Sequence, residues 1–281
     1  MSRSSIFGFL FFSTLLLLLL SGCSTVELQT DHSPVQLHII QKIDLGFIPA
    51  KCVYSSTEKT AFILEENTNY IHIYRNEKKV NTIGGLGFEN INFNELSDIT
   101  ISPDGKLLVL DSFQKKIKKF DKDGKWITEF DLVDFSEPRL FDISIDETFY
   151  IYDDNRKEII ISKYLNEKDF YTFGKFQLTD PQKLLLTKNS VVVFDSSENK
   201  TIVFDTLGQF LVDYNGNYQF DGYHTFKLES YNILHCRSNN KFAASTKRWK
   251  DFYINGNFVI LLSESEVWIA QFIYQQQPGK Y

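Results

Sequence analysis

Short runs of apolar residues return along the chain at a fixed interval, and polar residues separate them. Three of these runs end in an aspartate, at Asp111, Asp153 and Asp195, and successive aspartates are 42 residues apart. Each aspartate is followed by a polar stretch and then by a second apolar run. A constant interval of this length indicates an array of similar structural units, each with the same order of elements.

Each unit has the pattern of four short strands separated by turns. The apolar runs are rich in β-branched and aromatic residues, and turns such as Pro103–Gly105 and Asp121–Gly124 lie between them. Beyond the N-terminal segment, no stretch shows a sustained apolar period of about 3.6 residues, which excludes alternating strands and helices. Four strands in about 40–50 residues are typical of a propeller blade, so the predicted fold is an all-β propeller. Its blades must close into a ring, because each exposes apolar faces that only its neighbours can cover.

Equivalent positions in the rest of the chain predict six blades. Glu65 lies 46 residues before Asp111. Downstream, His235 lies 40 residues after Asp195, but only 28 residues separate it from the next equivalent position, Ser263. The fifth blade is therefore expected to be truncated or distorted. An open arc of five blades is the alternative.

The last blade lacks an outer strand in its own part of the sequence. Phe258–Ser263 and Val267–Phe272 supply its central strands, and the chain ends soon afterwards. At the other end of the propeller, Leu37–Leu45 has the pattern of a strand but belongs to no blade of its own. We expect this N-terminal strand to complete the last blade and hide its open edge, giving one propeller over residues 37–276.

One unit carries a recognisable order of motifs. A strand with an Asp-Gly turn (Ile99–Gly105), a strand ending in Asp-Ser (Leu107–Ser112) and an Ile-Lys-Lys-Phe-Asp strand with a second glycine turn (Ile117–Gly124) follow one another. This order resembles the NHL-type repeat of six-bladed propellers. The resemblance is good over residues 96–130 and moderate over residues 135–212. It implies architecture more than activity, because such propellers serve as binding platforms, lyases and lactonases alike.

The N-terminal segment has the pattern of an export signal. Arg3 is followed by 15 apolar residues, Ile6–Leu20, which is short for a membrane span of about 20 residues and suits a signal-peptide core. The segment ends in Leu20–Cys23, Leu-Ser-Gly-Cys, which resembles the lipobox of bacterial lipoproteins. The resemblance implies removal of residues 1–22 and lipidation of the Cys23 thiol. An uncleaved N-terminal anchor is the alternative.

The residues after Cys23 predict location and attachment. Ser24, in place of Asp, resembles the pattern that sorts lipoproteins to the outer membrane of a host with two membranes. In a host with one membrane, the protein would lie on the outer face of the plasma membrane. Residues 23–36 are polar without apolar periodicity, so they are expected to form a flexible tether between the membrane and the propeller.

Composition narrows the class of protein and of partner. A hydrophobic content of 43% is enough for a packed core and excludes a disordered chain. A net charge of −6 provides no field for polyanions, so nucleic acid is not an expected partner. Cys52 and Cys236 fall on non-adjacent blades and are expected to be free, buried thiols.

Local motifs for catalysis are few. The chain has five histidines and no Gly-x-Ser-x-Gly, His-x-x-x-His or glycine-rich phosphate loop. A zinc site would need several channel-facing histidines, and at most His224 and His235 are placed for that. Asp98, Asp142 and Asp251 on innermost strands are a candidate calcium set like that of propeller lactonases. We favour the simpler interpretation that these aspartates accept hydrogen bonds from turns and backbone N–H groups.

The sequence therefore favours a non-enzymatic binding or scaffolding module without catalytic residues or a cofactor. A propeller presents strand starts and loops of all its blades around one opening, which suits a protein, peptide or glycan partner. Trp249, in a charged segment, is a candidate exposed contact. The alternative is a calcium-dependent hydrolase or lactonase of the propeller type. The candidate binding residues share a place near the starts of the innermost strands: Lys51, Asp98, Arg139, Asp142, Lys183 and Asp251.

Overall fold

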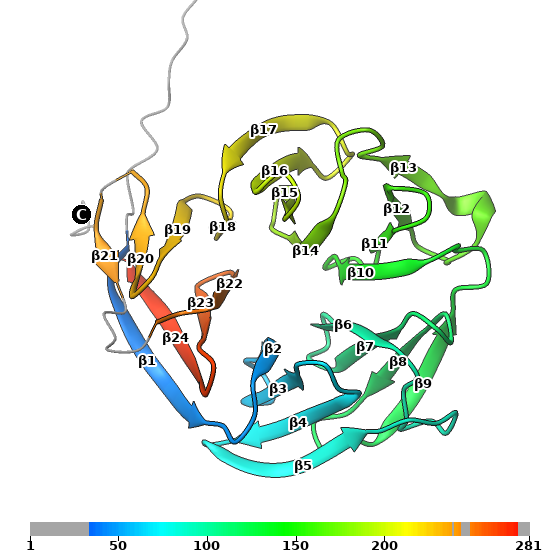
Figure 1. Ribbon diagram of the computed structural model, residues 1–281, viewed down its shortest axis with the longest axis horizontal. Helices are drawn as coiled ribbons and strands as arrows, with labels where there is room; N and C mark the ends of the chain where they lie inside the picture. The colour runs from blue at the N-terminus through cyan, green and yellow to red at the C-terminus, as the bar shows by residue number, and fades with distance from the viewer. Residues whose placement is uncertain (1–33, 238, 243–247, 275–281) are drawn as a thin grey trace, which may run out of the picture. The chain divides into compact units, whose positions relative to one another are not determined.

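The sequence repeat folds as a four-stranded antiparallel sheet, and six such sheets surround a central channel (Figure 1). The computed structural model describes residues 34–237, 239–242 and 248–274. Within each of the first five blades the chain runs from the innermost strand outwards. The six-bladed, all-β propeller predicted from the 42-residue interval is confirmed.

The first two blades have long, regular strands. They consist of β2 (Pro49–Ser55), β3 (Thr60–Glu65), β4 (Tyr70–Arg75) and β5 (Lys78–Gly84), and of β6 (Leu96–Ile101), β7 (Leu107–Asp111), β8 (Lys116–Phe120) and β9 (Trp126–Asp131). The next two are built in the same way, with a short 3-10 helix, η1 (Glu167–Asp169), before one outer strand. They consist of β10 (Pro138–Ile143), β11 (Phe149–Asp153), β12 (Glu158–Ser162) and β13 (Tyr171–Phe173), and of β14 (Pro181–Leu186), β15 (Ser190–Asp195), β16 (Lys200–Asp205) and β17 (Phe210–Asn215).

The fifth blade is complete but small. Its strands are β18 (Tyr218–Phe220), β19 (Thr225–Glu229), β20 (Asn232–His235) and β21 (Lys241–Phe242). His235 ends the third strand here, whereas the equivalent aspartates of other blades end the second strand. The second strand, β19, ends at Glu229, which is 34 residues after Asp195 and 34 before Ser263. The short interval in the sequence therefore arose from matching His235 to the wrong strand of a blade that is itself shorter than the others.

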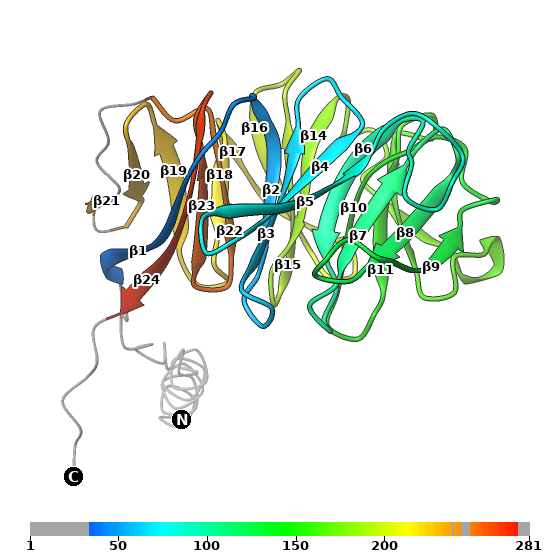
Figure 2. The ribbon, with the colours of Figure 1, turned by 90° about the horizontal axis from the view of Figure 1, so that it is seen from below.

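The N-terminal strand closes the ring. The last blade consists of β22 (Asp251–Asn255), β23 (Phe258–Leu262) and β24 (Glu266–Tyr274), and β1 (Pro34–Asp44) pairs with β24 as its outer strand. Leu37 lies opposite Phe272 and Ile43 opposite Val267, and Figure 2 shows the two strands side by side. The predicted closure is confirmed. The strand begins three residues earlier than the sequence suggested, at Pro34.

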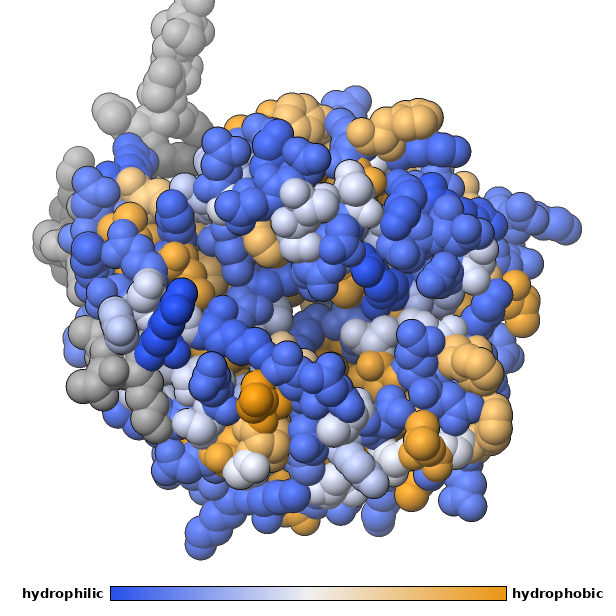
Figure 3. All heavy atoms as spheres, viewed as in Figure 1, coloured by the Kyte–Doolittle hydropathy of each residue, from blue (hydrophilic) through white to orange (hydrophobic). Residues whose placement is uncertain are grey.

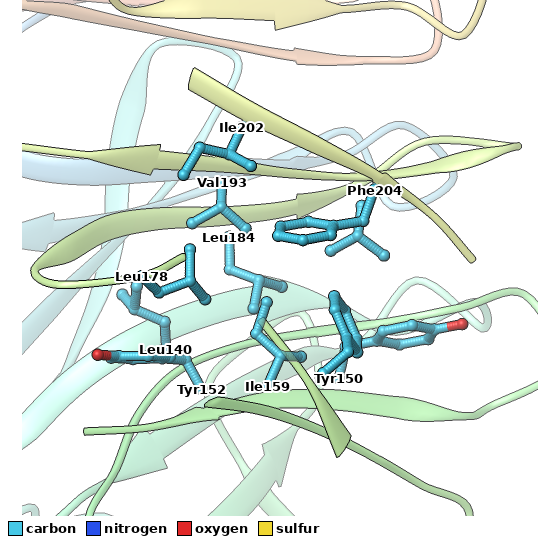
Figure 4. Packing of buried hydrophobic residues seen from close by; sticks show 11 residues of the cluster. Leu140, Tyr150, Tyr152, Ile159, Leu178, Leu184, Val193, Ile202 and Phe204 are labelled. Atoms are coloured by element: carbon cyan, nitrogen blue, oxygen red, sulfur yellow. The ribbon is translucent and has the colours of Figure 1, made fainter. Parts of the chain in front are cut away.

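Apolar side chains between neighbouring blades form the core. Between the third and fourth blades, Tyr152, Ile159, Val193 and Phe204 are buried and face one another across the gap between the sheets (Figure 4). Similar clusters fill other blade interfaces. Burying one such side chain stabilises the fold by about 1.5–3 kcal/mol, so the ring is held mainly by these apolar contacts.

Two further expectations concern single residues. Cys52 and Cys236 are both free, but only Cys52 is fully buried, and burial raises the pKa of its thiol. Trp249 is only 2% exposed, and its ring packs against Trp268 with centroids 4.9 Å apart. The expectation that Trp249 is an exposed contact was therefore wrong: its charged neighbours in the sequence conceal an apolar contact with the last blade.

The expected signal segment and tether fall mostly outside the described residues. Residues 1–33, including Cys23, are not described by the structure. Within the described ranges, no helix is long and apolar enough to cross a membrane.

Candidate functional site in the central channel

Four charged side chains occupy equivalent places on the innermost strands. Lys51 of β2, Asp98 of β6, Lys183 of β14 and Asp251 of β22 each lie opposite the last or next-to-last residue of the neighbouring second strand. In a ring of equivalent blades this shared register places them in one layer around the channel. The face shown in Figure 3 is hollowed at its centre, and mainly hydrophilic residues surround the hollow.

The four charges form two ion pairs. The Lys51 Nζ atom lies 2.7 Å from Asp98 Oδ1, and the two side chains are 12% and 3% exposed. Lys183 Nζ pairs with Asp251 Oδ1, and this carboxylate oxygen also accepts a hydrogen bond from Asn217 Nδ2 at 3.1 Å. Because β18 stands between β14 and β22 in the ring, the second pair ties together blades that are not neighbours.

Tyr253 lies between the two lysines. It follows Asp251 by two residues on β22, and the Nζ atoms of Lys51 and Lys183 are 5.8 Å and 4.8 Å from its ring centroid. Burial holds the pKa of Tyr253 well above its ordinary value, so the phenol stays protonated. Burial also lowers the pKa of Lys183, against the opposing effect of Asp251. The channel therefore holds a buried amine close to a second ammonium group and to a phenol that can donate a hydrogen bond.

Two of the candidate aspartates bind the next innermost strand along the ring. Asp98 Oδ2 accepts a hydrogen bond from the backbone N–H of Phe141 at 3.0 Å. Asp142 accepts from Thr100 Oγ1 at 2.7 Å with one oxygen and from the Leu186 N–H at 2.8 Å with the other. Burial raises the pKa of Asp142. These side chains thus connect β6, β10 and β14 at the channel wall.

This donor set does not fit a calcium ion. Calcium takes about six to eight oxygen ligands, whereas the carboxylates of Asp98, Asp142 and Asp251 already accept hydrogen bonds from N–H, hydroxyl or ammonium groups. Among the described residues, no three His, Cys, Asp or Glu side chains come together in a way that could hold a metal ion. His224 and His235, the remaining zinc candidates, lie in the fifth blade with ring centroids 5.2 Å apart.

Arg139 belongs to a different contact. Its guanidinium donates to Asp180 Oδ1 at 3.1 Å and to the Pro181 carbonyl, and it lies 5.5 Å from the ring centroid of Tyr152. These partners place Arg139 at the junction of the third and fourth blades. The structure therefore brings Lys51, Asp98, Lys183 and Asp251 together in the channel and gives Arg139 a separate role.

Sequence reasoning missed Tyr253 and Asn217. Tyr253 had a usable signal, because residues two apart on a strand face the same side and Asp251 was already a channel candidate. Asn217 precedes the short β18 in the least regular blade, where no repeat position could be assigned.

Solved structures of the same architecture align over most of the chain. A virginiamycin B lyase from Staphylococcus aureus has a TM-score of 0.55 at 12% sequence identity, covering 85% of this chain and 100% of that one. A streptogramin B lyase has a TM-score of 0.54 at 11% identity, with coverage of 84% and 98%. A gluconolactonase from Xanthomonas campestris has a TM-score of 0.56 at 9% identity, with coverage of 86% and 96%. At these identities the likeness establishes the fold.

Comparison by sequence gives no family. No protein-family profile matches the chain, and no curated protein sequence is significantly similar to it. The resemblance to NHL-type repeats is therefore confirmed only as a six-bladed propeller architecture.

The similar structures correct the expectation of a non-enzymatic protein. The solved propellers that this chain resembles are enzymes, two lyases and a lactonase. The expectation rested on the absence of local catalytic motifs, whereas a propeller assembles its channel from residues of different blades, far apart in the sequence. Of the two functions considered from the sequence, the propeller-type hydrolase or lactonase agrees better with these neighbours than the binding module does.

Proposed function

We propose that this protein is a propeller enzyme that hydrolyses an ester or lactone bond in its central channel, with Lys183 as the group that transfers protons. The observation that carries the proposal is the buried cluster of Lys51, Lys183 and Tyr253, held in place by Asp98 and Asp251. A desolvated lysine is a recognised general base, because burial favours its neutral form. The low exposure of the cluster also shields its charges from water, which strengthens their effect on a bound substrate.

Each member of the cluster has a defined part in the proposed reaction. Neutral Lys183 accepts a proton from water as the water oxygen attacks the carbonyl carbon of the substrate. The Lys51 ammonium and the Tyr253 hydroxyl stabilise the negative charge that develops on the carbonyl oxygen. When the C–O bond breaks, Lys183 returns its proton to the leaving alkoxide. Asp251 orients Lys183 throughout, and the products are an acid and an alcohol.

Hydrolysis of simple lactones and esters by the purified protein tests this proposal. Glucono-δ-lactone, δ-valerolactone and phenyl acetate serve as probes, and a pH indicator follows release of the acid. We expect at least one probe to be hydrolysed faster than it is spontaneously. Lys183→Met should lower kcat by about 100-fold or more, because general base catalysis contributes about 10²–10⁴-fold. EDTA should leave the rate unchanged, since the channel carboxylates are engaged with protein donors.

Lys118 offers a matched control. It lies on β8, is 1% exposed, and its Nζ donates to the carbonyl of Asn92 at 2.7 Å. Burial lowers the pKa of Lys118 as it does that of Lys183. Lys118→Met therefore removes a buried lysine away from the channel and should keep the catalytic rate. Spontaneous rates with all three probes, or equal rates for the two variants, would contradict the proposed function.

We also propose that the enzyme is lipid-anchored at Cys23 on the outer side of a bacterial membrane, and on the outer membrane where the host has two. The support is the apolar segment followed by Leu20–Cys23. Cys23→Ser should leave an unprocessed precursor that still carries residues 1–22, which intact-protein mass spectrometry detects. Normal cleavage of this variant would refute the anchor.

A further inference from the structure

A second concave site lies away from the channel, where the first and last blades meet. It is a groove with a volume of about 490 Å³, within the range of about 300–1,000 Å³ that small-molecule sites occupy. Its floor and walls come from strands of both blades, and its rim from the turns β2–β3 and β4–β5. Figure 1 shows this seam, where β1, β24 and β23 approach the blade of β2 to β5. The residues used below are Gln41, Tyr54, Lys59, Glu77, Phe258 and Gln271.

Gln41 gives the groove an unsatisfied hydrogen-bond acceptor. This residue of β1 is 5% exposed, and its amide oxygen has no hydrogen-bond partner in the described part of the chain. A buried polar group without a partner destabilises the fold, because it has lost its hydrogen bonds to water and gained none in return. A ligand that donates a hydrogen bond to this amide would remove that cost.

The other groups of the groove combine an aromatic wall with a polar rim. The rings of Tyr54 and Phe258 lie with centroids 5.6 Å apart and planes tilted by 56°. Gln271 adds a second amide to the lining, and Lys59 and Glu77 place opposite charges at the rim. Glu77 is fixed there, because its Oε1 accepts a hydrogen bond from the backbone N–H of Lys42 at 3.0 Å.

We propose that this groove binds a sugar of one or two rings. A sugar presents an apolar C–H face that packs on aromatic rings, and hydroxyl groups that both donate and accept hydrogen bonds. The hydroxyls match the Gln41 amide oxygen, the Glu77 carboxylate and the Lys59 ammonium at once. A purely apolar ligand would leave the Gln41 oxygen unpaired, and a simple anion would make no use of the aromatic wall.

Ligand-observed saturation-transfer NMR tests the proposal on the full-length protein. The probes are methyl glucoside, methyl galactoside, methyl N-acetylglucosaminide and maltose. We expect at least one to receive saturation from the protein. Ser56→Trp, at an exposed position that lines the groove, should fill it and abolish the signal without loss of stability. Tyr54→Leu and Gln41→Leu should each weaken binding by about tenfold, the effect of losing about 1.4 kcal/mol of contact.

Two controls locate the binding site. Tyr164→Leu removes a tyrosine that is 74% exposed outside the groove, and it should bind the sugar as the parent does. Lys183→Met, which tests the proposed catalytic function, should also keep the sugar signal. Thermal midpoints show whether each variant is folded. Silence with all four sugars, unchanged binding by Ser56→Trp, or loss of binding in Lys183→Met would overturn the groove as a sugar site, whatever the outcome of the lactone assays.

Discussion

Asp111, Asp153 and Asp195 occupy the same place in three successive blades, and all three are fully buried. Asp111 accepts hydrogen bonds from the backbone N–H groups of Asn94 at 2.8 Å and Gln114 at 2.9 Å. One carboxylate thus holds both the loop that enters its blade and the turn that leaves its second strand. These aspartates are structural, as their recurrence with the repeat predicted.

Replacing Asp111 with alanine tests this role. The change leaves at least two backbone N–H groups without an acceptor, so we expect the free energy of unfolding to fall by about 2–4 kcal/mol. Urea denaturation measures the difference. Asp131→Ala is the matched control, because its side chain on β9 is 66% exposed and makes only a long contact of 3.7 Å with Lys116. That variant should change stability by no more than about 0.5 kcal/mol. Equal losses in the two variants would show that the buried carboxylate has no special role.

Residues that recur are predictable from sequence, and residues that occur once are not. The repeat identified the buried aspartates and placed Lys51, Lys183 and Asp251 near the channel. It did not reveal that Lys183 pairs with Asp251, because that contact spans 68 residues and skips a blade. Nor did it show that Arg139, at the start of β10, binds Asp180 of the adjacent loop instead, since side chains at strand starts near the rim can face either way.

At the scale of elements, the closing strand β1 determines whether the ring is complete. Ile43 of β1 is 1% exposed and packs in the same cluster as Val267 and Ile269 of β24. Without β1, the nine residues of β24 would form an unpaired edge, which favours association with another chain. The sequence predicted this closure because a strand without a blade remained at one end and a blade without an outer strand at the other.

Removal of residues 1–44 should therefore lower the thermal midpoint and cause self-association. Differential scanning calorimetry measures the midpoint, and size-exclusion chromatography with light scattering measures the mass. A chain that lacks only residues 1–33 retains β1 and is the control, which should stay monomeric with the higher midpoint. If the shorter chain is equally stable and monomeric, β1 does not close the ring in solution.

At the scale of the whole molecule, apolar blade faces specify the ring and polar inner strands leave a channel for chemistry. Propellers that share only 9–12% of their residues with this chain have the same architecture. The fold was therefore predictable from strand pattern and repeat length, which depend on residue type. The channel cluster was not, because it needs the relative positions of side chains from different blades.

The central claim concerns the protonation of Lys183, and pH links it to stability. Because burial lowers the pKa of Lys183, the folded protein binds fewer protons than the unfolded chain between that lowered pKa and the ordinary value of 10.5. Stability from this residue should therefore rise with pH through that window, and Lys183→Met should remove this rise.

The most direct measurement is an NMR titration of the protein with ¹³C-labelled lysine, in which the spectrum of Lys183→Met assigns the Lys183 signal. The account predicts that the Lys183 Cε resonance titrates below the ordinary lysine pKa of 10.5. A Lys183 signal that titrates at or above 10.5 would mean that the Asp251 ion pair outweighs burial, and it would contradict the assignment of Lys183 as a general base.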